Sequence, residues 1–221
     1  MIRRLIFDVV NPLVLRMEGN PAWPVRRRVR PVEASQESAF DALLGAGLDD
    51  GGPINYDLPY PKVEYLKHAC DWRGLVAHGT QLDGLRVLEP IRLSSDSSDF
   101  GNLEQIFCSP DAIWAMWFAI LDKSKAGVTR NGCVRIGEGA ARVKYYHFAL
   151  PAEARDRSPF TNGTIYLARA EDFPSRHNIS ALQVFGGDYE EWGSSVPVEP
   201  LARISVGPHD FPYLDRVLSY L

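Results

Sequence analysis

The sequence predicts an α+β fold built mainly from antiparallel strands, with helices packed beside the strands. Short apolar runs typical of strands outnumber the helical segments, and they concentrate in the C-terminal half of the chain. One helix in the middle is apolar on nearly all sides, so it should be buried. With 221 residues, 45% of them hydrophobic, the chain can form one large domain or a small domain plus an extension.

The sequence predicts that residues 1–70 form an N-terminal extension, which packs on a core domain that comprises residues 71–221. An apolar run at residues 5–11 favours a buried strand over a signal peptide, because Asp8 and Asn11 interrupt it and no cleavage site follows. A helix is expected over residues 37–44. The loop expected at residues 49–61 is rich in Gly, Pro and Asp.

The basic run at residues 26–30 has two interpretations. The arginines could bind the phosphates of a nucleotide or nucleic-acid partner. Alternatively, they alternate with Val25 and Val29 as solvated side chains on an exposed edge strand. The second interpretation is favoured.

In the core domain the sequence predicts strands at residues 75–79 and 105–108, followed by a helix that reaches residue 121. Ser109 is the expected N-cap of this helix and Pro110 its first residue. The Asn-Gly pairs at positions 131–132 and 162–163 are typical of hairpin turns. Later strands are expected at residues 143–150, 163–167 and 198–206.

Charge, cysteine content and hydropathy limit the class of protein. The formal net charge of −4 gives no overall attraction to nucleic acid. Cys70, Cys108 and Cys133 are irregularly spaced and form no CxxC pair, which indicates a reducing compartment and argues against a zinc site. No run approaches the roughly 18 apolar residues of a membrane span. A cytoplasmic protein without membrane or metal is therefore expected.

Three segments carry the residues suited to chemistry: residues 75–80 (LVAHGT), 106–119 (IFCSPDAIWAMWFA) and 190–204 (EEWGSSVPVEPLARI). In order and spacing they resemble the ADP-ribosyltransferase superfamily, in its His-Tyr-Glu branch with the poly(ADP-ribose) polymerases and diphtheria toxin. The resemblance covers roughly residues 72–207. It implies an ADP-ribosyltransferase-like split antiparallel β-sheet core with flanking helices, in a bacterial member whose target is unassigned.

The resemblance also implies NAD⁺ as co-substrate, without a metal. The Gly79 backbone and the Thr80 hydroxyl would hold the nicotinamide carboxamide, and His78 would hydrogen-bond a ribose hydroxyl. The ring of Phe107 or Trp117 would stack on the cationic nicotinamide. The implied NAD-binding set is His78, Gly79, Thr80, Phe107, Ser109 and Trp117. Phe107 stands where the branch has a tyrosine, so it can stack but cannot donate a hydrogen bond.

Glu191 is the expected catalytic carboxylate, together with His78. Breaking the glycosidic bond builds positive charge on the ribose, which a nearby carboxylate stabilises, and the same group could deprotonate the acceptor. Glu190 is the alternative, because the register is open by one residue.

The expected function is transfer of ADP-ribose to a macromolecular acceptor, protein or nucleic acid, as in a toxin or antiphage effector with an antitoxin or regulatory partner. NAD glycohydrolase, RNA 2′-phosphotransfer and a degenerate nucleotide- or RNA-binding domain are the alternatives. Acceptor specificity is expected in the loops at residues 94–102 and 174–188.

Overall fold

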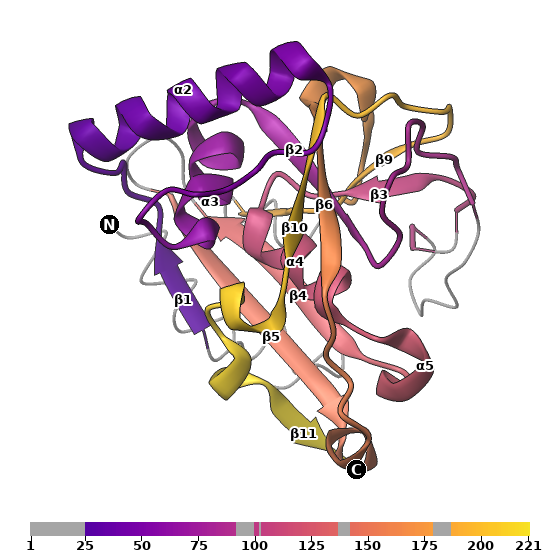
Figure 1. The fold of residues 1–221 in the computed structure, drawn as a ribbon. Helices are drawn as coiled ribbons and strands as arrows, with labels where there is room; N and C mark the ends of the chain where they lie inside the picture. Colours follow the sequence, from indigo (N-terminus) through magenta and orange to yellow (C-terminus); the bar gives the residue numbers. More distant parts are fainter. Residues whose placement is uncertain (1–24, 92–99, 102, 137–141, 179–186) are drawn as a thin grey trace.

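The computed structural model describes residues 25–91, 100–101, 103–136, 142–178 and 187–221 (Figure 1). Within them, helices pack against strands that pair almost entirely in antiparallel fashion, which confirms the predicted α+β class. In these ranges no helix has the length and apolar character needed to cross a bilayer. The strand expected at residues 5–11 lies outside the described residues, as does most of the loop expected at 94–102.

The first sheet has the strand order β1 (Val25–Arg28), β5 (Val143–Pro151), β4 (Arg130–Ile136) and β8 (Gly187–Tyr189), all antiparallel. A further strand, β11 (Leu218–Tyr220), pairs with β5 in parallel. Residues 143–150 are buried at every position, as expected for a strand covered on both faces. The predicted strand at residues 143–150 is confirmed, whereas the predicted turn at residues 131–132 is wrong because β4 runs through it.

The second sheet places β6 (Gly163–Arg169) between β10 (Ala202–Val206) and β2 (Leu75–Thr80), again antiparallel. The predicted strands at residues 75–79 and 163–167 are confirmed. The strand expected at residues 198–206 forms only from Ala202 onward.

A third, smaller sheet has the order β3 (Ile106–Cys108), β9 (Trp192–Ser194) and β7 (Ser175–Arg176). Two backbone hydrogen bonds join it to β2: Ala77 N to Ser109 O at 2.8 Å and Ser109 N to Ala77 O at 2.9 Å. The second and third sheets therefore meet where the His-Gly-Thr segment and the Phe107 strand run side by side.

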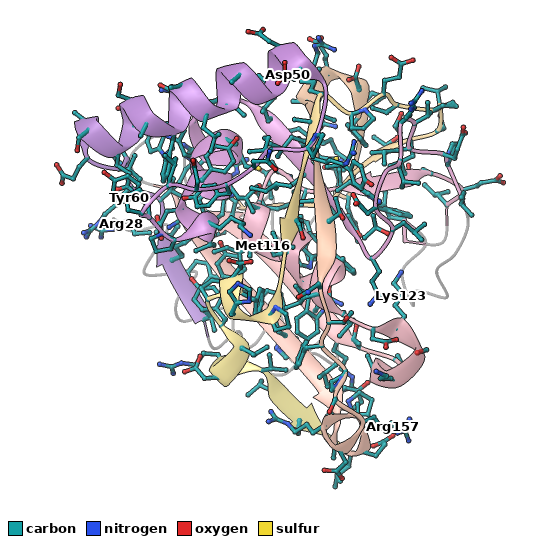
Figure 2. All side chains as sticks on the ribbon, viewed as in Figure 1. Arg28, Asp50, Tyr60, Met116, Lys123 and Arg157 are labelled. Carbon is teal, nitrogen blue, oxygen red and sulfur yellow. The ribbon has the colours of Figure 1, made fainter. Side chains whose placement is uncertain are left out.

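The described helices are α2 (Ala34–Asp50), α3 (Lys62–Trp72), α4 (Ala112–Ile120) and α5 (Lys123–Ala126). The shorter 3-10 helices span Ala152–Arg157, Ala170–Asp172, Pro208–Asp210 and Leu214–Arg216. Helix α4 lies at the centre of the molecule, with Met116 fully buried, whereas Arg28, Asp50 and Arg157 lie at the periphery (Figure 2).

Two glycines let the second sheet lie against the backbone of α4. A Cβ atom at Gly79 would come within 1.9 Å of the Ala115 carbonyl oxygen. A Cβ at Gly163 would come equally close to the Ala119 carbonyl oxygen, at 1.9 Å. Because such distances are far inside van der Waals contact, glycine is required at both positions by helix packing.

One hydrophobic core joins residues on both sides of position 70. Phe40 of α2 and Leu66 of α3 belong to the same buried cluster as Trp117 and Ile165. The expected boundary between residues 70 and 71 falls inside α3. Residues 25–70 are thus packed on the rest of the chain, and α3 continues across the expected boundary.

Helix starts also differ from the sequence prediction. Helix α2 begins before and ends after the expected span of residues 37–44. The N-cap of α4 is Asp111, whose Oδ1 accepts a hydrogen bond from Trp114 N at 2.8 Å, and not Ser109.

Candidate functional site

A cavity of about 270 Å³ lies at the junction of β2, β3 and the first turns of α4. Six of the expected site residues line it: His78, Gly79, Thr80, Phe107, Ser109 and Glu191. These residues come from three segments that lie far apart in the sequence. The fold therefore brings the expected site residues together, with Trp117 as the exception.

Trp117 is fully buried and does not line this cavity. Its ring packs 5.0 Å from that of Phe148 and 5.9 Å from that of Phe160, measured between centroids. The expected stacking of Trp117 on a ligand is therefore wrong, and the ring belongs to the core. Trp114 and Phe118, on another side of the same helix, line the cavity instead.

His78 is held in one tautomer by the backbone of β3. Its Nδ1 donates a hydrogen bond to the Phe107 carbonyl oxygen at 2.7 Å, because a carbonyl can only accept. Burial lowers the pKa of His78, with a smaller contribution in the same direction from Lys123, while the Phe107 carbonyl opposes the shift. The ring is therefore neutral near pH 7, and Nε2 carries a lone pair that can accept a hydrogen bond from a ligand hydroxyl.

Three of the other expected contacts have structural tasks. Gly79 makes room for α4, as described above. The Thr80 Oγ1 accepts a hydrogen bond from Leu82 N at 3.3 Å. The Ser109 hydroxyl donates to the Glu190 carbonyl oxygen at 2.6 Å and accepts from Asp111 N at 2.9 Å. Ser109, which is buried, thus ties the segment that precedes β9 to the start of α4.

Glu191 immediately precedes β9 and lines the cavity. His177 Nδ1 donates a hydrogen bond to its Oε2 at 2.7 Å, and His177 N donates to the Glu191 carbonyl oxygen at 3.0 Å. The His177 ring stacks on Phe100 with 4.8 Å between centroids and lies 4.7 Å from the ring of Tyr189. Glu191 is therefore held by a histidine that is itself packed between two aromatic rings.

Neither His177 nor Gln105 was expected at the site. Gln105 is 3% exposed and lines the cavity, and its side-chain Nε2 has no hydrogen-bond partner among the described residues. It is a donor that a bound ligand could satisfy. A lone His and a lone Gln carry no local sequence signal, so only the tertiary arrangement identifies them.

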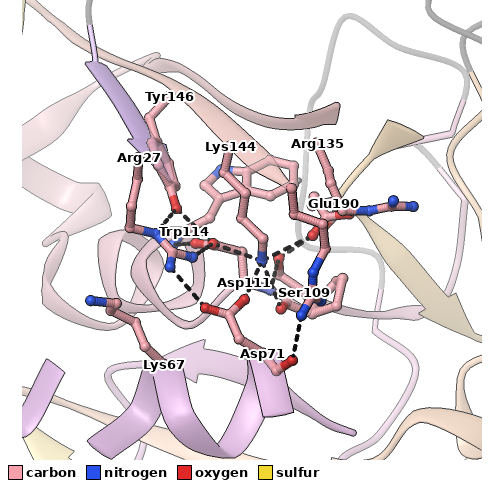
Figure 3. A network of polar contacts seen from close by, with 12 residues as sticks. Arg27, Lys67, Asp71, Ser109, Asp111, Trp114, Arg135, Lys144, Tyr146 and Glu190 are labelled. Atoms are coloured by element: carbon pink, nitrogen blue, oxygen red, sulfur yellow. Dashed lines mark hydrogen bonds and ion pairs between the residues drawn. The ribbon is translucent and has the colours of Figure 1, made fainter. Parts of the chain in front are cut away.

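Glu190 does not line this cavity, and its carboxylate belongs to a buried ionic cluster (Figure 3). Its Oε1 lies 3.0 Å from Arg135 Nε and its Oε2 lies 3.1 Å from Lys144 Nζ. The adjacent acids thus have different surroundings, and Glu191 is the one that faces the candidate site.

Lys144 lies at the centre of the cluster and is 1% exposed. Its Nζ is 2.9 Å from Asp71 Oδ1 and 3.0 Å from Asp111 Oδ2, in addition to Glu190. Burial by itself would raise the pKa of both aspartates, but Lys144 and then Arg27 lower the pKa of each below its ordinary value. Burial would lower the pKa of Lys144, yet the three carboxylates raise it well above the usual range.

The Arg26–Arg30 run contributes to the same cluster. β1 lies at the end of the first sheet's strand order, as the edge-strand interpretation expects. Arg27, however, is only 9% exposed at its side chain: its guanidinium contacts Asp71 at 2.8 Å and Asp111 at 3.0 Å, and its Nε donates to Tyr146 Oη at 2.8 Å. The expectation that these arginines are simply solvated is wrong for Arg27, whereas Arg28 is exposed.

The three cysteines are free and buried. Within the described ranges, no group of three or more His, Cys, Asp or Glu side chains is arranged to hold a metal ion. Comparison of the chain with protein-family models, with curated proteins and with solved structures finds no match.

Proposed function

We propose that this protein cleaves the nicotinamide–ribose bond of NAD⁺ and transfers ADP-ribose to a macromolecular acceptor, on an ADP-ribosyltransferase-like fold. The proposal depends on one observation: His78, Phe107 and Glu191 line a single cavity although they lie on three separate segments.

The chemistry needs a neutral acceptor for a ribose hydroxyl and a negative charge near the anomeric carbon. His78 Nε2 supplies the first, because its Nδ1 is committed to the Phe107 carbonyl. The carboxylate of Glu191 supplies the second and stabilises the cationic sugar as nicotinamide leaves. The same carboxylate then takes the proton of the attacking acceptor.

The walls of the cavity suit the nicotinamide end of the molecule. Phe107 and Trp114 offer aromatic surface to a cationic ring. At about 270 Å³, the cavity lies near the lower limit of roughly 300 Å³ that is typical of small-molecule sites. In this proposal the nicotinamide and its ribose occupy the cavity, and the pyrophosphate lies at its mouth. Lys123, an exposed residue that lines the cavity, provides a cation for that anionic group (Figure 2).

The test is mass spectrometry of the purified protein incubated with NAD⁺, with and without a cell lysate. We expect nicotinamide release together with the mass of ADP-ribose added to a protein or a nucleic acid. Release with only free ADP-ribose would assign an NAD glycohydrolase, in which water replaces the acceptor. If NAD⁺ is neither cleaved nor bound, the proposal is wrong and a non-catalytic binding domain takes its place.

His177 is expected to position Glu191 for this reaction. Replacing His177 by Ala removes the hydrogen bond to Oε2 and frees the carboxylate to rotate, so we expect kcat to fall roughly tenfold to a hundredfold with a smaller change in KM. Steady-state kinetics of nicotinamide release would measure both parameters.

The conservative variant His177→Asn retains a side-chain N–H donor and should restore part of kcat. His209→Ala is the matched control, because the His209 side chain is 80% exposed. Equal kinetics for His177→Ala and the control would show that the hydrogen bond to Glu191 plays no part in turnover.

A further inference from the structure

Gln105 lines the candidate cavity, the one that His78 and Glu191 also line, with a side chain that is almost entirely buried. Within the described ranges its Nε2 has no hydrogen-bond partner. A buried amide donor without a partner costs free energy, because it has lost its hydrogen bonds to water and has formed none in exchange. At the wall of a cavity such a group can bind a ligand that carries an acceptor. The reaction proposed above makes no use of it.

A glycine in β9 provides the space in which this amide lies. A Cβ atom at Gly193 would lie 2.3 Å from Gln105 Cδ, 2.3 Å from its Oε1 and 2.6 Å from its Nε2. These distances are far inside van der Waals contact, so no larger residue fits at position 193 while the amide stays in place. The Gln105 amide therefore occupies the position of the side chain that Gly193 lacks.

The amide lies on the same face of β9 as Glu191. Side chains alternate along a strand, so positions 191 and 193 project to one face and Trp192 projects to the other. The lining of the cavities agrees with this alternation: Glu191 and Gln105 line the candidate cavity, whereas Trp192 lines a separate one. The Gln105 amide and Glu191 are therefore neighbours along one wall of the candidate cavity.

Phe107 of β3 lies directly opposite Gly193, because the two residues are paired in the register of β3 and β9. The Cβ positions of such directly opposed residues are about 4.5–5.5 Å apart. Since the Gln105 amide occupies the Cβ position of residue 193, it lies beside the Phe107 side chain. An aromatic ligand that stacks on Phe107 therefore meets an N–H donor at the edge of its ring.

The neighbouring carboxylate decides which acceptor suits this donor. The Gln105 amide is neutral and cannot offset the charge of an anionic ring substituent, whereas Glu191 on the same face would repel one. An uncharged carbonyl oxygen accepts the hydrogen bond without that repulsion. The ligand that fits is thus an aromatic ring that carries an uncharged carbonyl group.

We propose that Gln105 is a specificity-determining residue, which donates a hydrogen bond to the carbonyl oxygen of the ring that stacks on Phe107. In NAD⁺ this oxygen belongs to the nicotinamide carboxamide, so the identity of the ligand rests on the proposed function. The family resemblance assigned the carboxamide to Gly79 and Thr80. In the structure Gly79 accommodates α4, and the Thr80 hydroxyl accepts from Leu82 N.

Isothermal titration calorimetry with NAD⁺ and with an analogue whose ring is plain pyridinium tests this contact. The titrations use a Glu191→Gln background, which suppresses cleavage. Gln105→Met removes the donor and keeps a side chain of similar length. It should weaken NAD⁺ binding about tenfold and leave the affinity for the analogue unchanged, because the analogue has no carbonyl oxygen. Equal losses for both ligands, or no loss for either, would overturn the proposal.

Thermal unfolding without ligand gives a second readout. Removing an unsatisfied donor should leave the thermal midpoint of Gln105→Met equal to or above that of the parent protein. A fall of several degrees would show that the amide has a structural role and would contradict the assignment. Gln36→Met is the matched control for both measurements, because Gln36 lies in α2 and does not line the cavity.

The same experiment separates this proposal from the proposed function. If the Glu191→Gln protein binds neither dinucleotide, the proposed function and the carboxamide contact are both wrong. If Gln105→Met abolishes the preference for NAD⁺ over the analogue while the parent protein cleaves no NAD⁺, the contact is upheld and only the proposed reaction is wrong.

Discussion

Glu191→Gln is expected to lower the rate of nicotinamide release by about a hundredfold to a thousandfold, the size of effect seen when one preorganised electrostatic group is removed from an active site. The amide keeps the shape of the side chain but no longer carries the charge that stabilises the cationic ribose. It also cannot take a proton from the acceptor. The effect should therefore appear in kcat at saturating NAD⁺, measured by chromatography of released nicotinamide.

The loss of activity in Glu191→Gln must be distinguished from a loss of folded protein. Among the described residues, Glu191 lies outside the buried ionic cluster and its carboxylate pairs with His177, so the thermal midpoint of Glu191→Gln should stay close to that of the parent protein. Glu171→Gln is the control, because the Glu171 side chain is 80% exposed. His78→Ala should also impair turnover, mainly through the ribose contact. Unchanged turnover in both Glu191→Gln and His78→Ala would remove the basis of the site assignment.

The sequence predicts the strand of the candidate site from the residues next to His78. The apolar run before His78 is stopped by a glycine, and the structure shows a strand whose Gly79 meets the backbone of α4. That strand depends on neighbouring residues and is predicted without knowledge of the fold. Glu191, in contrast, was expected from the order of three distant segments in the family resemblance, and it immediately precedes β9.

The direction in which a side chain points from an apolar helix cannot be predicted from the neighbouring residues. Helix α4 is apolar on nearly every side, so its sequence gives no hydrophobic face from which to orient Trp114 and Trp117. The contacts made by the sheets and by Phe148 decide that Trp117 enters the core and that Trp114 lines the cavity. An expectation based on motif order alone therefore selected the wrong indole.

The sequence also did not predict the polar contacts between distant chain segments. In the sequence Lys144 is one polar residue within an apolar strand. In the structure three carboxylates from separate segments surround it. Asn131, expected in a turn, lies in β4 and its Oδ1 accepts a hydrogen bond from Trp114 Nε1 at 2.8 Å. Each of these roles depends on chain segments that only the tertiary fold brings together.

Lys144→Met is expected to destabilise the protein by about 3–5 kcal/mol, the cost of removing one partner from a buried ion pair. Methionine fills a similar volume, so the loss reflects charge: Asp71, Asp111 and Glu190 would remain buried with Arg27 and Arg135 as the nearby cations. Urea unfolding would measure the change in the free energy of unfolding. Lys125→Met, at a side chain that is 49% exposed, should change it little.

A double-mutant cycle tests whether the loss is electrostatic. Adding Glu190→Gln to Lys144→Met removes one of the uncompensated negative charges, so the double variant should be less destabilised than the sum of the two single variants. Strict additivity of the two substitutions would show that Lys144 acts through packing alone and would contradict the ionic account of the cluster.

The pH dependence of the Lys144→Met effect gives an independent check. Because Lys144 lowers the folded-state pKa of Asp71 and Asp111, their contribution to stability is fully present above their ordinary pKa of 3.8 and is lost as the pH falls below it. The difference in unfolding free energy between parent and variant should therefore be largest near neutral pH and shrink on acidification through pH 4. A difference that stayed constant between pH 7 and pH 3 would indicate a packing defect, whereas a shrinking one would show that the paired charges hold α3, α4 and β5 together.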